Sequence, residues 1–239
     1  MTPREAAARR AMDFVREGMT LGLGTGKTAS HFIAALGERW SRDPFPLRCV
    51  ATSRQTYELA AQWRIPLVEL NEVERIDLTV DGADEVDPAL NLIKGGGGAL
   101  VREKLVAAAS QELIIVCDAS KLRPALGAFP LPVAILPFGW RTTLRRLQAF
   151  CQHVTLRLSS GPGTPPYTTD DGLYIADMHL QVIRDPGALE RSLKCVTGVA
   201  EVGLFIAMAS RVLVGHEDGH VEEKTRSQTV LQPGGGNAT

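Results

Sequence analysis

Short apolar segments alternate with helix-like segments through the first half of this chain, and that order restricts the fold more than any other feature. Strands are expected at residues 19–24, 47–53, 66–70, 76–81 and 113–118. Helices are expected at residues 3–17, 29–40, 54–63 and 98–110. Strands that alternate with helices at this spacing favour a parallel sheet with helices on both faces.

The pattern changes where proline-rich punctuation precedes a second set of elements. These follow the order strand, helix, strand, strand, helix, strand, at residues 131–136, 140–151, 153–159, 173–180, 186–196 and 199–203. That βαββαβ order is the ferredoxin-like α+β arrangement, and the apolar segment 204–215 would return to the first sheet. We therefore expect an α/β fold with a Rossmann-like parallel sheet domain (1–128 and 204–223), an inserted ferredoxin-like domain (129–203) and a disordered tail (224–239).

Composition and charge exclude several classes of protein. Hydrophobic residues make up 44% of the 239 residues, and the net charge of −1 argues against a general affinity for nucleic acid or anionic membranes. No apolar run approaches the ~20 residues of a membrane span, and the N-terminus lacks the apolar region of a signal peptide. The four cysteines form no CxxC pair, and three lie in apolar runs, which indicates reduced core residues. We expect a soluble cytoplasmic protein.

Two carboxylates lie at the end of the expected strand 76–81, in the segment Asp81-Gly82-Ala83-Asp84. Small residues let the backbone turn tightly and approach a ligand, and the carboxyl ends of strands border the ligand crevice of an α/β sheet. Asp81 and Asp84 could instead cap a turn, which is the commonest role of aspartate in loops. They could also bind Mg²⁺. The residues by themselves leave these alternatives open.

A cation and a glycine loop, Lys94 with residues 95–98, open the helix that follows. Four glycines cost backbone entropy, and a glycine turn at a helix start presents N–H groups to an anion. Glu103 lies early in that helix, where a solvated glutamate is also favourable; as a general base it would need to reach the proton that it takes. Lys121, at the end of the expected strand 113–118, is either a surface lysine or a phosphate contact.

A second glycine-rich turn, GLGTGKT at residues 22–28, lies between an expected strand and an expected helix, a common way to direct N–H groups at a phosphate. The Walker A motif requires a glycine five residues before Gly26, where this chain has a leucine, so the spacing disfavours a nucleotide hydrolase. A phosphate- or hydroxyl-binding turn made by Thr25, Gly26, Lys27 and Thr28 is favoured over an ordinary tight turn. The five histidines form no metal-spaced cluster, and we expect no metal site.

Several segments resemble the type A ribose-5-phosphate isomerase family. They are GLGTGKTASHF (22–32), ATSRQT (51–56), DGADEVDP (81–88), KGGGGALVREKLVA (94–107) and CDASK (117–121), with weaker matches in TDDGLYIAD (169–177) and VTGVAEVGLF (196–205). These segments run through nearly the whole chain in the order typical of the family. The combination DGADE, KGGGGAL and REK is highly specific.

The resemblance implies interconversion of ribose 5-phosphate and ribulose 5-phosphate through an enediolate, without metal or cofactor, in the non-oxidative pentose phosphate pathway. Glu103 is then the base that moves a proton between C2 and C1, while Asp81, Asp84 and Lys94 open the ring and stabilise charge on the sugar oxygens. The implied substrate-binding residues are Thr25, Gly26, Lys27, Thr28, Asp81, Gly82, Ala83, Asp84, Lys94, Gly95, Gly96, Gly97 and Lys121. The resemblance also implies a homodimer or homotetramer.

The chain departs from the family pattern at a few positions. Lys27 replaces the serine of the usual GTGST, which adds a charge beside the expected site, and Val202 lies where asparagine or histidine is expected. Arg4 is a candidate for the basic residue that family members often carry near the N-terminus. Two other functions are weaker: a non-catalytic sugar-phosphate sensor on the same fold, which would normally carry a helix-turn-helix for which residues 1–18 are too short, and a nucleotide hydrolase.

Overall fold

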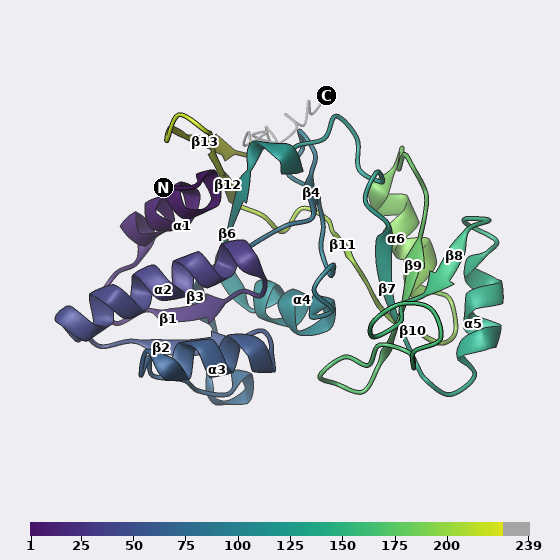
Figure 1. The fold of residues 1–239 in the computed structure, drawn as a ribbon, viewed down its shortest axis with the longest axis horizontal. Coiled ribbons are helices and arrows are strands. Elements are labelled where there is room, and N and C mark those ends of the chain that lie inside the picture. The colour runs from purple at the N-terminus through teal and green to yellow at the C-terminus, as the bar shows by residue number, and fades with distance from the viewer. Residues whose placement is uncertain (227–239) are drawn as a thin grey trace, which may run out of the picture.

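A six-stranded, mostly parallel sheet is the centre of the larger layer in the computed structural model, which describes residues 1–226 (Figure 1). Its strands, in the order β13-β12-β6-β3-β1-β2, are Val221–Thr225, Arg211–Gly215, Ser110–Asp118, Ile76–Asp81, Thr20–Leu23 and Arg48–Ala51. Only β13 runs antiparallel to its neighbour among these described strands. The carboxyl ends of β1, β3 and β6 therefore meet at one edge of the sheet.

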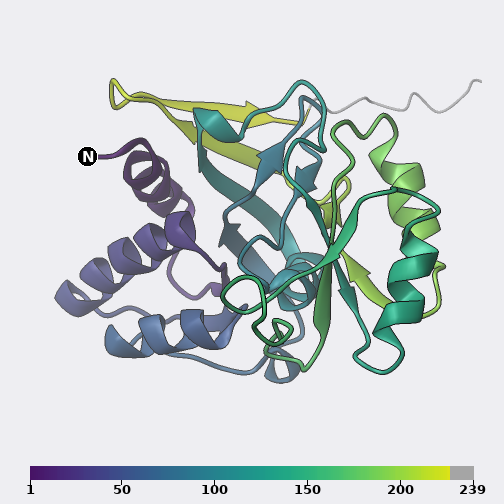
Figure 2. The ribbon, with the colours of Figure 1, turned by 45° about the vertical axis from the view of Figure 1, so that its right-hand side comes forward.

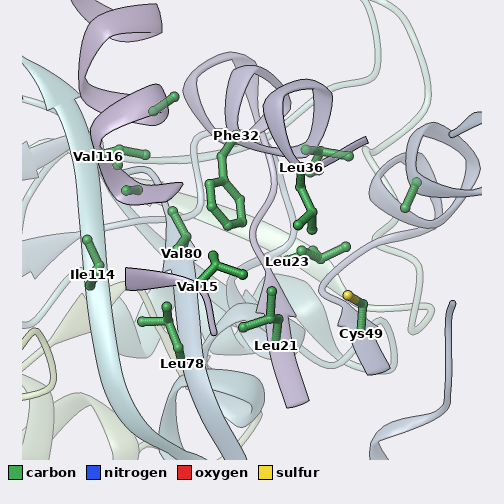
Figure 3. Packing of buried hydrophobic residues seen from close by; sticks show 14 of the residues in the cluster. Val15, Leu21, Leu23, Phe32, Leu36, Cys49, Leu78, Val80, Ile114 and Val116 are labelled. Carbon is green, nitrogen blue, oxygen red and sulfur yellow. The ribbon is translucent and has the colours of Figure 1, made fainter. Parts of the chain in front are cut away.

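Three helices cover one face of this sheet: α1 (Pro3–Ala11), α2 (Lys27–Arg42) and α3 (Arg54–Gln62). Alternate residues of each strand point to the same face, so Leu21 and Leu23 of β1 and Leu78 and Val80 of β3 meet Phe32 of α2 (Figure 3). The first of these helices begins with a capping box, in which Thr2 and Glu5 each bond the backbone of the other. No helix within residues 1–226 is long and apolar enough to cross a membrane.

The opposite face is covered by α4 (Leu100–Ala108) and by a small sheet of the order β11-β5-β4. Its strands are Leu204–Phe205, Leu92–Ile93 and Glu85–Val86. Phe205 is fully buried there among residues of β6 and β12. The residues between β3 and α4 thus fold back over the sheet, which brings the start of α4 to the carboxyl end of β3.

The second sheet has four antiparallel strands in the order β10-β7-β9-β8 (Figure 2). They are β7 (Leu131–Ile135), β8 (Val154–Leu156), β9 (Tyr174–Met178) and β10 (Val199–Val202), with the helices α5 (Trp140–Leu147) and α6 (Pro186–Lys194) between them. Both helices pack on the face that points away from the main sheet, and Leu100 of α4 packs on the other face. The βαββαβ order and the pairing of the first strand between the third and fourth confirm the expected ferredoxin-like unit beside a Rossmann-like sheet.

The chain crosses between the two sheets at two fixed points. Near the first crossing, the buried Glu85 carboxylate accepts hydrogen bonds from the N–H groups of Gly127 (2.7 Å) and Phe129 (2.8 Å). At the second, Gly203 donates to the carbonyl of Pro132 and accepts from the N–H of Lys94. We propose that the domain boundaries expected from the sequence, 1–128 with 204–223 and 129–203, lie at these crossings.

Several expected elements differ from the structure. The strand expected at 66–70 is wrong: a single bridge joins Leu67 to Cys49, and a 3₁₀ turn follows at Leu70–Glu72, because only two backbone hydrogen bonds hold this short segment at the edge of the sheet. The first helix ends at Ala11 and continues as the 3₁₀ turn Met12–Phe14. The small sheet was not expected, since strands of two residues carry no readable period.

The expected tail and cysteine environments are also partly wrong. Lys224 and Thr225 belong to β13, where they pair with β12, so the tail does not begin at residue 224. Residues 227–239 lie outside the part of the chain that the structure describes. Cys49 and Cys117 are buried as expected, whereas Cys195 is exposed.

Replacement of Phe32 by alanine tests the packing of the main core. Phe32 is fully buried, and removal of a large buried aromatic side chain costs about 3–5 kcal/mol through lost burial and the cavity left behind. We expect Phe32→Ala to lower the free energy of unfolding, measured in urea, by this amount. The control is Phe138→Ala, because Phe138 is 96% exposed and its removal should change stability by less than about 0.5 kcal/mol. Equal losses in both variants would contradict this account of the core.

Candidate active site

A cavity of about 290 Å³ lies at the carboxyl ends of β1, β3 and β6. It is lined by Arg4, Thr25, Gly26, Lys27, Thr28, Gly82, Ala83, Asp84, Lys94, Gly95, Gly96, Gly97, Glu103 and Lys121. The structure therefore gathers in one place every site residue predicted from the sequence except Asp81, which does not line the cavity but contacts residues that do. Parallel α/β sheets place their ligand crevices at this edge.

A buried ion triad forms one wall of the cavity. The ammonium Nζ of Lys94 lies 3.0 Å from Oδ2 of Asp81 and 3.0 Å from Oε1 of Glu103, and it also donates to the carbonyl of Gly82. All three charged side chains are at least nine-tenths buried. The three N–H donors of the lysine are thus matched by three oxygens, which come from the end of β3, the following turn and the first turn of α4.

The triad shifts the pKa of each member. Burial raises the pKa of Glu103 to about 8, and the nearby Asp81 charge adds to that rise while Lys94 opposes it. Burial also raises the pKa of Asp81 against the opposing effect of Lys94. Burial by itself would lower the pKa of Lys94, but the two carboxylates outweigh it and raise that pKa above its usual range. Lys94 is therefore a permanent cation, and Glu103 changes protonation near neutral pH, as a general acid or base must.

The two carboxylate oxygens of Glu103 have different environments. Oε1 accepts from Lys94, whereas Oε2 is buried and has no hydrogen-bond partner among the described residues. A buried polar atom without a partner costs about 1–3 kcal/mol. Glu103 lines the cavity, and Oε2 is the oxygen of its carboxylate that the described residues leave without a hydrogen bond.

The glycine loop approaches the second carboxylate of the site. The N–H of Gly96 donates to Oδ2 of Asp84 at 2.8 Å. A Cβ atom on Gly96 would lie 2.6 Å from Oδ1 of Asp84, and Gly95 has a φ of +105°, which other residues rarely adopt. Glycine is therefore required here for close approach of the backbone, as the sequence predicts.

Asp81 is one of the groups that hold the turn before α2. Oδ1 of Asp81 accepts from the N–H of Thr25 (3.1 Å) and of Gly82 (2.7 Å). A Cβ atom on Gly24 would lie 2.1 Å from the same oxygen, so only glycine fits beside the carboxylate. Asp81 thus connects the turn before α2 to the turn after β3, and its other oxygen forms the ion pair with Lys94.

A cluster of hydroxyl groups beneath this turn was missed by the sequence reasoning. Oγ1 of Thr25 lies 2.7 Å from the hydroxyl of Thr52, 2.8 Å from that of Ser53 and 3.1 Å from that of Thr56. These residues come from the end of β2 and the start of α3, and Thr52 and Thr56 also donate to the carbonyls of residues 23 and 24. The sequence does contain a signal for this cluster, because the segments after β1 and β2 both carry hydroxyl residues. Neighbouring parallel strands bring such ends together.

Positive charge surrounds the open part of the cavity. Arg4, Lys27 and Lys121 line it, and Arg4 is held by Asp118 of β6, with Nε 2.6 Å from Oδ2. Residues 1–226 contain no group of three or more histidine, cysteine, aspartate or glutamate side chains placed to hold a metal ion. The arrangement can bind a small anionic molecule through lysines, an arginine and backbone N–H groups, and can transfer a proton at Glu103.

The family model described as ribose 5-phosphate isomerase A (phosphoriboisomerase A) matches residues 48–219. Ribose-5-phosphate isomerase A of Cereibacter sphaeroides is 48% identical over 227 residues, which cover 92% of this chain and 90% of that protein. The relative from Dinoroseobacter shibae is 46% identical over 223 residues, with coverage of 90% and 85%.

Solved structures agree with these relatives. Ribose 5-phosphate isomerase A from Methanocaldococcus jannaschii superimposes with a TM-score of 0.87 at 37% identity, over 93% of this chain and 97% of that one. A D-ribose-5-phosphate isomerase in complex with phospho-erythronic acid gives a TM-score of 0.88 at 37% identity and the same coverage. Fold, site and relatives agree, and the chain belongs to the ribose 5-phosphate isomerase A family.

Proposed function

We propose that this chain interconverts D-ribose 5-phosphate and D-ribulose 5-phosphate through an enediolate, with Glu103 as the base. The reaction follows from membership of an isomerase family. The assignment of the base rests on one observation: Glu103 is a buried carboxylate with one oxygen on Lys94 and the other unpartnered, at the wall of the cavity. Deprotonated Glu103 takes the proton from C2 of the open-chain aldose and returns it to C1, while the proton of the C2 hydroxyl moves to the C1 oxygen, which gives the ketose.

The other members of the buried triad support this proton transfer. As the C2 proton leaves, negative charge develops on the sugar oxygens, and a cation with preorganised N–H donors stabilises such charge. Lys94 supplies the cation and its own N–H donors, and the loop at 95–97 helps to hold the substrate. Asp81 keeps Lys94 in place, and Asp84, which lines the cavity, exchanges protons with the sugar hydroxyls during ring opening.

The remaining cations and turns hold the substrate. Arg4, Lys27, Lys121 and the N–H groups of the turn at 25–28 would bind the phosphate, and its binding energy orients the reacting carbons. The complex of a family member with phospho-erythronic acid supports a site for a phosphorylated sugar acid of this size.

The cellular setting is proposed on the same family basis. We infer a cytoplasmic homodimer or homotetramer that acts in the non-oxidative pentose phosphate pathway. The reaction would need no metal and no cofactor, because the triad supplies both the base and the stabilising charge. Sedimentation of the purified chain tests the assembly state.

Replacement of Glu103 by glutamine tests the choice of base. The amide keeps the size of the side chain but cannot take a proton, so we expect kcat for ribose 5-phosphate to fall about 10²–10⁴-fold, in excess EDTA as without it. Ketose formation is the measurement. Glu58→Gln, a change at an exposed glutamate of α3, is the control and should leave kcat unchanged.

Two outcomes would contradict the proposal in different ways. Turnover retained by Glu103→Gln would mean that another residue is the base. A wild-type protein that binds ribose 5-phosphate and does not convert it would favour the sensor function.

The pH profile tests the raised pKa of Glu103. The base must be ionised, so kcat/KM should rise about tenfold per pH unit at low pH and level off above the pKa of about 8. Stability should change in the opposite direction, because between its ordinary pKa of 4.5 and about 8 the folded state binds the Glu103 proton more tightly than the unfolded state. Unfolding free energy should therefore fall as pH rises through this range, and Glu103→Gln should remove that fall. A kcat/KM that is flat from pH 5 to 9 would be incompatible with this assignment.

Lys27 tests the contribution of charge at the mouth of the cavity. This lysine is exposed at the start of α2 and forms no ion pair with another described residue. Lys27→Ser should raise KM about twofold to fivefold, the effect of an exposed ion pair of up to ~1 kcal/mol, and should weaken the dependence of KM on salt. Lys194→Ser, a change outside the cavity, is the control. An unaltered KM and salt dependence would show that Lys27 does not contact the phosphate.

A further inference from the structure

Arg157 of the second domain holds the back of the glycine loop. It follows β8 directly, and its guanidinium forms a two-pronged ion pair with Asp177 of β9. Its remaining nitrogen, Nη1, donates to the carbonyls of Gly95 (2.8 Å) and Gly96 (3.1 Å). Both charged side chains are only 16% exposed. One arginine thus connects the ferredoxin-like sheet to the loop that lines the cavity.

The contact fixes the direction of two peptide groups. In a trans peptide the C=O and N–H groups point to opposite sides. Because Arg157 holds the carbonyls of Gly95 and Gly96, the N–H groups of residues 96 and 97 point away from the arginine. The first of them meets Asp84, which lines the cavity, and this agrees with that direction. The glycines themselves provide no such restraint, because their φ and ψ angles are nearly free.

Other groups on the same side support this restraint. The hydroxyl of Tyr167, on the loop after Arg157, lies 3.4 Å from the carbonyl of Gly97, and a Cβ atom on Gly98 would lie 2.2 Å from that hydroxyl. The N–H of Tyr167 in turn donates to the carbonyl of Arg157. The carbonyls of residues 95–97 are therefore held from the side of the second domain, while the N–H of Gly96 meets Asp84.

We propose that Arg157 is a positioning residue: it directs the N–H group of Gly97 and, through the N–H group of Gly96, the Asp84 carboxylate toward the bound substrate, and Asp177 orients Arg157. The proposal rests on the proposed function in that it names the sugar phosphate as the ligand of these groups. Arg157 does not line the cavity, so it acts through the loop. Its loss should weaken binding more than it slows the chemical step, because Lys94 and Glu103 keep their own contacts.

The test compares Arg157→Ala with wild type in three measurements. KM for ribose 5-phosphate and the dissociation constant of phospho-erythronic acid should each rise about tenfold, with kcat within about threefold of wild type. Hydrogen exchange of the amides of residues 96–98 should accelerate about tenfold or more, while amides of β3 stay protected. Arg157→Lys should recover part of the affinity, since a lysine reaches a carbonyl but cannot hold Asp177 at two points. Arg145→Ala, a change on α5 of the same domain, is the matched control and should match wild type.

A purely structural role for Arg157 would give a different pattern. KM and exchange at 96–98 equal to wild type would overturn the proposal, as would a fall in kcat at constant KM. If Arg157→Ala does not fold, Asp177→Asn is the variant to measure, because the amide keeps the shape of the aspartate but binds Arg157 more weakly. We then expect a higher KM and faster hydrogen exchange in the loop. If KM and exchange both stay at the wild-type values, the proposal is overturned. Absence of turnover in the wild type would refute the proposed function alone, because the exchange experiment still tests the restraint on the loop.

Discussion

The rest of the site depends on the ion pairs that the buried ammonium of Lys94 forms. This ammonium lies between the carboxylates of Asp81 and Glu103, and two buried carboxylates this close could not both ionise without it. An unpaired buried charge costs several kcal/mol, so each member is required by the others. Their positions follow from the sheet, because Asp81 ends β3, Lys94 follows β5 and Glu103 lies in the first turn of α4.

The second domain is part of this arrangement because α4 is fixed to it. Lys104, beside Glu103, is buried and donates to the carbonyls of residues 202 and 204 and to the carboxylates of Glu190 and Glu201. The ammonium groups of Lys94 and Lys104 both lie near the ring of Phe205, at 5.5 Å and 5.0 Å from its centroid. The segment that returns from the inserted domain therefore helps to fix the helix that carries the proposed base. The main sheet and the inserted domain thus both restrain α4, and such restraint favours catalysis because reacting groups must be held in one geometry.

The fold and the cavity could be read from the sequence where periodicity and glycine patterns are strong. Most strands of the two larger sheets follow from apolar segments of three to nine residues, although the polar strand β13 was not predicted. The two glycine-rich turns were placed correctly because only glycine permits their close approach to Asp81 and Asp84. Contacts between distant segments could not be read in this way. Thr56 contacts Thr25, which lies 31 positions away, and Arg157 contacts Gly95, which lies 62 positions away. Nothing in the local sequence around Thr56 or Arg157 indicates these partners. The strand expected at 66–70 was wrong for a different reason. An apolar run at the edge of a sheet resembles a strand in sequence, but it has only one neighbouring strand to pair with.

The energetics of Glu103 argue for catalysis over binding alone. A sensor of sugar phosphates needs cations and N–H donors, which the two glycine-rich turns and the residues around them provide. It gains nothing from a carboxylate whose pKa is raised to about 8 by burial and whose second oxygen lacks a partner among the described residues, because both features destabilise the folded state. Such a cost persists where the strained group takes part in chemistry. An ionised Glu103 that is poorly solvated is a stronger base than the same group in water. Because Oε1 is bound to Lys94, we propose Oε2 as the atom that takes the proton.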